Sequence, residues 1–118
     1  MQAVNEPVDA ENFKKKALKK MCPDQQCLRS FGNEIGRKIL LRIAQFRAAN
    51  CLEDLRNISW HEELKRNRQT QLSCRLTANW RLIYRPLGNW EDYLENGSLS
   101  WTKVDRIEII EAEDYHGN

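Results

Sequence analysis

The sequence predicts a single α+β domain, because a helical period in the first half of the chain gives way to a strand period in the second. Between residues 9 and 55 apolar side chains recur every three or four positions, as along one face of an amphipathic helix. From residue 70 they alternate with polar side chains, which is the period of a β-strand. Helices followed by strands favour α+β over alternating α/β. The 118 residues suffice for one hydrophobic core, and no linker or repeat divides them.

The first predicted helix runs through ENFKKKALKKM (11–21), with Asp9 as a candidate cap. Phe13, Ala17 and Met21 are spaced by four and form one apolar stripe, with lysines on the other faces. Pro23 then ends the helix, because proline lacks a backbone donor and clashes with the preceding turn.

The second predicted helix carries a longer apolar stripe. Gly32 and Gly36 weaken its first turns, since Gly in a helix costs about 1 kcal/mol relative to Ala. The regular helix is therefore expected to begin near Asn33 and stop near Asn50, with an earlier turn before it and a short helical turn at residues 51–55. The stripe consists of Leu28, Phe31, Ile35, Ile39, Leu40, Ile43 and Phe46.

The strand half begins with a predicted antiparallel hairpin. TQLSCRLT (70–77) and WRLIYRP (80–86) alternate in polarity and are joined by Ala78-Asn79. Residues 87–101 contain two glycine turn signals and are expected to form a long loop, and VDRIEIIEA (104–112) is the last predicted strand. In the second hairpin strand, one face is expected to carry Trp80, Leu82 and Tyr84, and the other Arg81, Ile83 and Arg85.

The net charge of +2 conceals a basic middle and an acidic end. Residues 29–85 hold twelve Lys or Arg and five Asp or Glu, a net charge of +7, whereas residues 86–118 carry −6. A basic segment suits a partner with a phosphate backbone, although solvated helix faces also carry scattered arginines. The acidic end argues against pure nucleic-acid binding unless it is turned away from the backbone.

Several protein classes are disfavoured by what the sequence lacks. It has no glycine-rich phosphate loop, no dinucleotide fingerprint and no nucleophile elbow. The four cysteines and two histidines have no metal-ligand spacing, so neither a metal nor a cofactor is expected. No apolar stretch approaches the roughly 18 residues of a membrane span, and the polar start is unlike a secretory signal. The expected location is the cytoplasm.

The side chains that remain suit RNA chemistry. Arg81 and Arg85 share a strand face, Asn79 lies at the hairpin turn, and Tyr115 and His116 follow the last strand. Arginine stabilises charge developing on a phosphate, and histidine, with a pKa of about 6.5, exchanges a proton at neutral pH. RNA supplies its own nucleophile, the 2′-hydroxyl, so its cleavage needs only positioning, deprotonation and charge neutralisation.

Each of these residues also has a structural interpretation. A lone histidine is more often a surface or capping residue than a catalyst, Tyr115 suits a core anchor, and Arg81 suits an ion pair across the sheet. His61 and Lys65 are four apart and share a face if their segment is a helical turn. The four tryptophans suit core or loop anchors, and an exposed one suits a base-stacking platform.

The segments LSCRLTANWRLIYRP and VDRIEIIEAEDYHG resemble the RelE/ParE superfamily of bacterial toxins, most closely its HigB branch. The matching motifs are HEELK (61–65), NWRL (79–82) and EDYH (113–116), and the preceding helix is also similar. HEELK has one residue more between His and Lys than the usual family motif.

The resemblance implies two N-terminal helices packed on a small, curved, antiparallel-rich sheet, as in microbial ribonucleases. It implies metal-free cleavage of mRNA, usually on the ribosome. It also implies a cognate antitoxin, often of helix-turn-helix type, through which the toxin reaches operator DNA. The implied catalytic residues are Arg81, His116, Tyr115 and His61, and the implied RNA contacts are Lys65, Asn79, Arg85, Lys38 and Arg42.

Two other functions fit the same resemblance less well. Toxins of the ParE branch poison DNA gyrase without acid–base residues, and the EDYH ending together with His61 favours the nuclease. A non-catalytic RNA-binding module would show affinity that falls steeply with salt, without cleavage.

Overall fold

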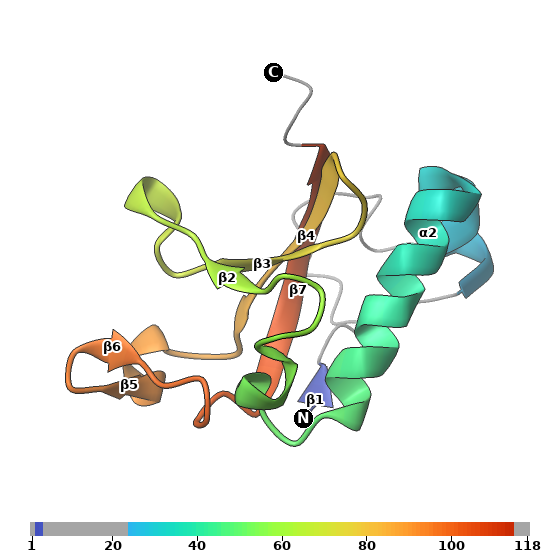
Figure 1. Ribbon diagram of the computed structural model, residues 1–118. Coiled ribbons are helices and arrows are strands. Elements are labelled where there is room, and N and C mark those ends of the chain that lie inside the picture. Colours follow the sequence, from blue (N-terminus) through green and yellow to red (C-terminus); the bar gives the residue numbers. More distant parts are fainter. Residues whose placement is uncertain (1, 4–23, 115–118) are drawn as a thin grey trace.

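A five-stranded sheet with one long helix against one face forms the body of the protein (Figure 1). The computed structural model describes residues 2–3 and 24–114. The first predicted helix, the Tyr115–His116 pair and the chain end therefore lie outside the described residues. The predicted α+β class is confirmed, with one of the two expected helices described. Within the described residues, no helix is long and apolar enough to cross a membrane.

The sheet has the strand order β1-β7-β4-β3-β2. β1 runs parallel to β7, and every other pair of neighbours is antiparallel. The long pairing between β4 and β7 forms its centre and is shifted by a bulge between Ile83 and Tyr84. The strands are β1 (Gln2–Ala3), β2 (Glu62–Glu63), β3 (Leu72–Arg75), β4 (Trp80–Pro86) and β7 (Arg106–Asp114).

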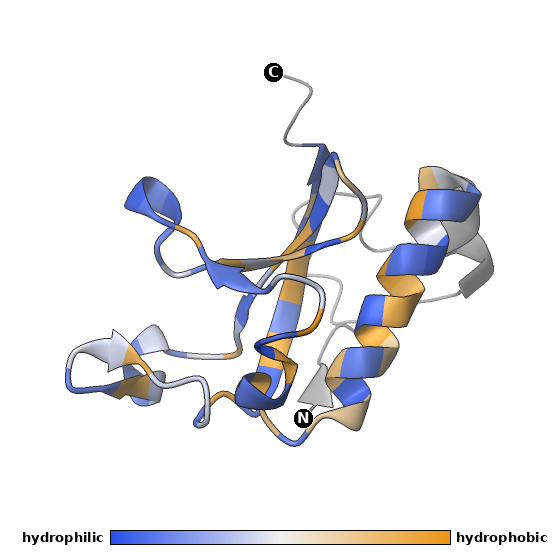
Figure 2. Ribbon diagram, viewed as in Figure 1, coloured by the Kyte–Doolittle hydropathy of each residue, from blue (hydrophilic) through white to orange (hydrophobic). Residues whose placement is uncertain are grey.

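The helix α2 (Asp24–Ala48) is interrupted at Gly32, whose φ of 84° and ψ of 168° are not helical. The expected arrangement, an early turn followed by a regular helix from about Asn33, is confirmed. Glycine adopts this backbone conformation readily, whereas a residue with a side chain would be strained in it. In Figure 2 hydrophobic and hydrophilic residues alternate along the ribbon of α2, as expected for a helix with one buried face.

The hydrophobic core lies between α2 and the sheet. The apolar stripe of the helix packs against alternate residues of β3, β4 and β7, as the two periods of the sequence predict. The buried residues include Ile35, Ile39, Ile43 and Phe46 from α2, and Leu72, Cys74, Leu82, Tyr84, Ile107 and Ile109 from the sheet.

The connection after β4 corrects the expectation of a long loop at residues 87–101. It contains a 3-10 turn, η4 (Trp90–Tyr93), and a two-stranded sheet of β5 (Leu94–Glu95) and β6 (Ser98–Leu99). Asn96 and Gly97 join these strands with φ values of 54° and 83°, which type I′ hairpin turns require. Strands of two residues are too short to show a period in the sequence.

The β3–β4 hairpin turn is longer than the Ala78-Asn79 link expected. The strands end at Arg75 and resume at Trp80, and the Leu76 N–H donates to the Trp80 carbonyl at 2.9 Å. The Thr77 hydroxyl accepts from the Trp80 N–H at 3.2 Å. A threonine side chain thus closes the turn in place of a two-residue backbone turn. Two further 3-10 turns are η2 (Leu52–Leu55) and η3 (Arg66–Arg68).

Candidate functional site

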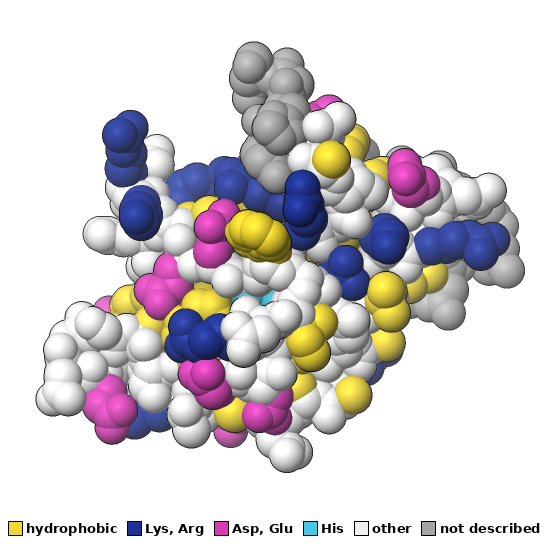
Figure 3. All heavy atoms as spheres, in the orientation of Figure 1, with side chains coloured by type: hydrophobic (Ala, Val, Ile, Leu, Met, Phe, Trp, Pro, Cys, Tyr) yellow, Lys and Arg dark blue, Asp and Glu magenta, His cyan; other side chains and the backbone are white. Residues whose placement is uncertain are grey.

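The face of the sheet turned away from α2, here called the outer face, is charged. Leu82 and Tyr84 of β4 belong to the core on the helix side, so Arg81 between β3 and β7 points outward. Arg81 pairs with Arg75 on one side and Glu113 on the other, which places all three on the outer face. Figure 3 shows Lys and Arg side chains gathered across the upper part of its view, with Asp and Glu between them.

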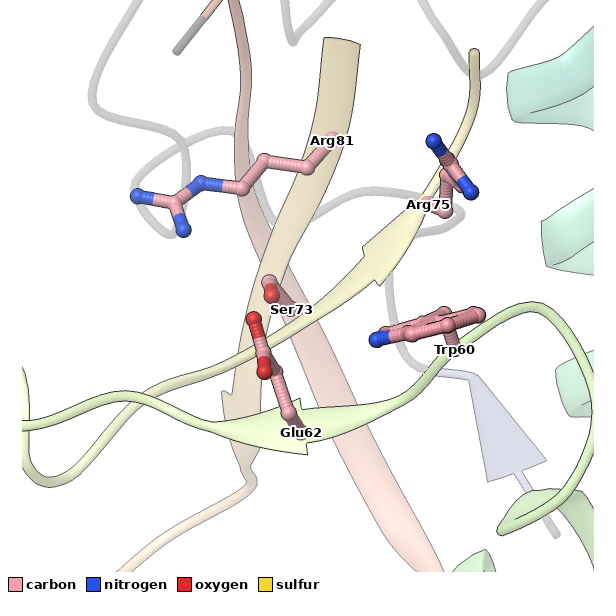
Figure 4. Close-up of a pocket in the computed structure, with 5 residues that line it drawn as sticks. All are labelled: Trp60, Glu62, Ser73, Arg75 and Arg81. Carbon is pink, nitrogen blue, oxygen red and sulfur yellow. The ribbon is translucent and has the colours of Figure 1, made fainter. Parts of the chain in front are cut away.

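A pocket of about 260 Å³ opens on the outer face. Its lining residues are Trp60, Glu62, Ser73, Arg75 and Arg81 (Figure 4). Figure 4 shows the Glu62 carboxylate beside Ser73, its cross-strand partner, with Trp60 and Arg75 on one side and Arg81 on the other. Glu62, Arg75 and Arg81 therefore line a single opening and come from β2, β3 and β4 respectively.

Glu113 of β7 holds Arg81 in place. Arg81 Nε donates to Glu113 Oε2 at 2.7 Å, and its Nη2 lies 2.6 Å from the same oxygen. Arg68 Nη1 donates to both oxygens of Glu113 at 3.1 Å. Burial acts to raise the pKa of Glu113, but hydrogen bonds from Arg68 and Arg81 outweigh it, so the pKa is lowered overall. Arg81 therefore forms an ion pair with Glu113 across the sheet, as its structural interpretation predicts.

His61 lies on the helix side of the sheet, apart from Arg81. Its ring is 8% exposed and packs edge-on against Phe46 and Tyr84. Nδ1 lies 2.6 Å from the Tyr84 hydroxyl, and in the described part of the chain Nε2 has no hydrogen-bond partner. Burial, and secondarily the charge of Arg42, lower the pKa of His61 from 6.5 to about 4, so the ring is neutral near pH 7.

The segment around His61 is extended, because Glu62 and Glu63 form β2. The helical turn that would place Lys65 on the same face as His61 is therefore absent. Lys65 is exposed at the start of η3 and lines a different hollow, beside Arg66 and the β5–β6 hairpin. Structurally, His61 and Lys65 do not form one group with Arg81.

The other predicted RNA contacts occupy varied positions. Arg42 is 8% exposed, and its Nε donates to the Arg75 carbonyl at 2.8 Å, which ties α2 to the end of β3. Lys38 is partly exposed on the same helix, and Asn79 is exposed at the hairpin turn. Arg85 forms an ion pair with the buried Glu108 of β7. Of the described site residues predicted from sequence, Arg81 alone lines the pocket.

Sequence reasoning missed Glu62, Ser73, Arg75, Trp60 and Glu113 as neighbours of Arg81. In the sequence, Glu62 is conspicuous only because HEELK has one residue more between His61 and Lys65 than the usual motif. Its place beside Ser73 depends on the β2–β3 register, which a two-residue strand does not reveal. The alternation of Ser73 and Arg75 with buried Leu72 and Cys74 was a usable signal.

Among residues 2–3 and 24–114, no group of three or more His, Cys, Asp or Glu side chains is arranged to hold a metal ion. Of the cysteines described, Cys51 and Cys74 are free thiols. Burial raises the pKa of Cys74 to about 12, so this thiol is a core side chain and not a nucleophile.

The fold is shared with a toxin of known structure. The YoeB/ParE toxin from Agrobacterium tumefaciens superimposes with a TM-score of 0.54 over 97% of this chain and 98% of its own, at 18% sequence identity. A scan of protein-family models and a search of curated sequences give no significant match. The likeness establishes a common fold over nearly the whole chain, in agreement with the toxin-like fold expected from the sequence motifs.

Proposed function

We propose that this chain is the toxin of a type II toxin–antitoxin pair and cleaves mRNA as a metal-independent endoribonuclease associated with the ribosome. The observation that carries the proposal is the pocket that Glu62 lines together with Arg75 and Arg81. A base and two phosphate-binding cations are the groups that cleavage by the 2′-hydroxyl requires. The shared fold with the YoeB/ParE toxin supports it.

In this proposal Glu62 takes the proton from the 2′-hydroxyl. The 2′-oxygen then attacks the adjacent phosphorus, the bond to the 5′-oxygen breaks, and the products carry a 2′,3′-cyclic phosphate and a 5′-hydroxyl. Arg81, held by Glu113, stabilises the charge that develops on the phosphorane oxygens. Arg75, on the opposite side of Glu62, binds the phosphate and lowers its initial repulsion from the carboxylate.

His116 gives a proton to the departing 5′-oxygen, and Tyr115 orients it or holds the substrate. What supports these two roles is the register of β7: Arg81 pairs with Glu113 and Trp80 with Asp114, so the last described residue of β7 adjoins the start of β4. His61 has a structural role in the proposal, because its neutral ring is buried on the helix side of the sheet.

Basic and polar side chains outside the pocket also contact the substrate. Lys65, Asn79 and Lys38 bind message or ribosomal RNA, and Arg85 does so where Glu108 leaves its guanidinium accessible. Arg42 acts through the Arg75 backbone that it holds. A cognate antitoxin, of helix-turn-helix type, neutralises the protein and links it to operator DNA.

The proposal is tested by cleavage of a defined message in a translation reaction. Glu62→Gln removes the base but keeps the shape, and Arg81→Ala removes the cation; each is expected to lower cleavage by about 100-fold or more. Arg56→Ala is the matched control, because Arg56 is an exposed arginine paired with Glu53, away from the pocket. Full cleavage by Glu62→Gln contradicts the mechanism. Gyrase-trapped DNA breaks without message cleavage would instead favour ParE-like poisoning.

A further inference from the structure

Trp60 is the most exposed large apolar side chain in the described part of the protein. It is 70% exposed, compared with 45% for Leu41 and 43% for Ile58. An indole of this size normally buries most of its surface. The exposed ring beside the charged pocket therefore offers an aromatic face to a ligand.

The backbone fixes Trp60 in this exposed position. Ser59 and Trp60 have φ values of 60° and 57°, a left-handed conformation that is costly for residues other than glycine. The Ser59 carbonyl accepts a hydrogen bond from the Arg75 N–H at 2.8 Å, and its hydroxyl donates to Gln45 at 3.4 Å. Contacts from β3 and α2 thus hold the two strained residues, and the exposure is built into the fold.

Trp60 also forms a wall of the pocket that holds Glu62 and Arg81. The guanidinium carbon of Arg75 lies 5.7 Å from the centre of its ring, within cation–π distance. Figure 4 shows the indole beside the opening, opposite Arg81 across Glu62. The pocket therefore has an aromatic surface at one side and an arginine at the other, which is the combination that single-stranded nucleic acid binds.

We propose that Trp60 is a stacking platform for one base of the RNA, next to the phosphate that Arg81 binds. The proposal rests on the function proposed above and adds the residue that positions the bound strand. Stacking accepts any base, because every base has an aromatic face. Trp60 thus fixes which phosphodiester lies against Glu62 without reading a sequence, and Arg75 binds the phosphate that adjoins the stacked base.

The test measures binding of an uncleavable 2′-O-methyl hexanucleotide to protein labelled with ¹⁵N at its tryptophan indoles. The Trp60 indole signal is assigned by its loss in Trp60→Phe. Trp60→Ala is expected to weaken binding by about 10- to 100-fold, and Trp60→Phe to retain most of the affinity. Ile58→Ala, at another exposed apolar residue of the same loop that does not line the pocket, is the matched control and is expected to bind as the unmodified protein does.

Oligonucleotides with one abasic position separate stacking from general attraction. One abasic position is expected to weaken binding to the unmodified protein by the same factor as Trp60→Ala and to have no further effect on that variant. The proposal is overturned if Trp60→Ala and the unmodified protein bind the oligonucleotide with equal affinity. It is overturned in that case even if the variant has lost binding to a protein partner such as the antitoxin. Equal abasic losses in both proteins also overturn it.

Message cleavage by the same variants distinguishes this proposal from the nuclease proposal. If base-dependent binding is lost in Trp60→Ala but the unmodified protein cuts no message, the stacking platform stands and the nuclease does not. If the unmodified protein cuts message and Trp60→Ala binds normally, the nuclease stands and the stacking platform does not.

Discussion

Two residues that the sequence places in one catalytic group, His61 and Arg81, belong to opposite faces of the sheet. His61 contacts Phe46 and Tyr84 in the core, where burial disfavours its charged form. Arg81 is 20% exposed and keeps an ion pair with Glu113 on the outer face. The register of strand pairing decides this separation, because a shift of one residue moves a side chain to the opposite face of the sheet.

His61 makes stability depend on pH. Its pKa falls from 6.5 when unfolded to about 4 when folded, so the unfolded chain binds the proton first as pH falls. Stability from this residue is full above pH 6.5 and is lost as pH drops towards 4, by about 3 kcal/mol in total. His61→Gln is expected to remove this dependence of the free energy of unfolding on pH. Urea unfolding at pH 7.0, 5.75 and 4.75 measures it, because these values are spaced at roughly the width of one titration.

The pH window separates the contribution of His61 from that of Glu113. The carboxyl of Glu113 has a pKa lowered below 4.5, so its contribution is lost only under more acidic conditions. His116→Gln, measured alongside, is the control that identifies any part of the slope that belongs to the second histidine. An unchanged slope in His61→Gln would show that His61 is accessible to protons in the folded protein.

Glu113 is expected to act as a positioning residue for Arg81. Glu113→Gln keeps one acceptor oxygen but removes the charge that holds Arg81 and Arg68. Because a misplaced catalytic group costs about 10- to 100-fold in rate, kcat for message cleavage should fall by that range while KM stays nearly constant. Glu113→Asp should restore part of kcat. A fall confined to KM would assign Glu113 to substrate binding instead.

Among the elements, α2 shows how a local break coexists with a continuous apolar stripe. Gly32 interrupts the hydrogen-bonded turns, yet Ile35, Ile39 and Ile43 after it are buried against the sheet. The break lets the first turns of α2 take a direction that a straight helix would not allow.

Gly32→Ala is expected to destabilise the protein by about 1–3 kcal/mol, because Gly32 has a φ of 84° and ψ of 168°. An added Cβ would meet no atom within 4 Å, so the cost is backbone strain alone. In a regular helix the same change would stabilise by about 1 kcal/mol. Urea unfolding therefore distinguishes the two cases: Gly32→Ala lowers the free energy of unfolding if the helix is broken at Gly32 and raises it if the helix is continuous.

The elements with a long hydrophobic period were predictable, and the short ones were not. α2, β4 and β7 carry enough alternation to reveal both their type and the face that they bury. β2, β5 and β6 have two residues each, and tertiary pairing alone defines them. The charged pocket depends on β2, so Arg81 could be predicted from its strand while its neighbours Glu62 and Trp60 could not.

Over the whole molecule, the basic middle and the acidic end of the sequence do not form separate surfaces. β7 lies beside β4, so the acids of the chain end meet the arginines of the middle. Among the described residues, three arginines form four ion pairs with acids of β7: Arg81–Glu113, Arg68–Glu113, Arg68–Glu111 and Arg85–Glu108. The charge asymmetry in the sequence is thus largely cancelled where the two segments meet on the sheet.

This cancellation predicts a shallow salt dependence for RNA binding. A free charge of +7 would give a slope of about −5 for the logarithm of affinity against the logarithm of salt on single strands. With three arginines already paired, the slope is expected to be weaker than about −3. Fluorescence anisotropy of a labelled oligonucleotide across a salt series measures it, and a slope near −5 would show that RNA displaces the acids of β7.

The chemistry of the RNA ends after expression tests the nuclease most directly. We expect new 5′-hydroxyl ends within reading frames, matched by 2′,3′-cyclic phosphates, and we expect Glu62→Gln to abolish them. These ends follow from attack by the 2′-hydroxyl, the nucleophile that the Glu62–Arg81 pocket is proposed to activate. Intact messages in arrested cells, or 5′-phosphate ends that persist in Glu62→Gln, would contradict the proposed chemistry.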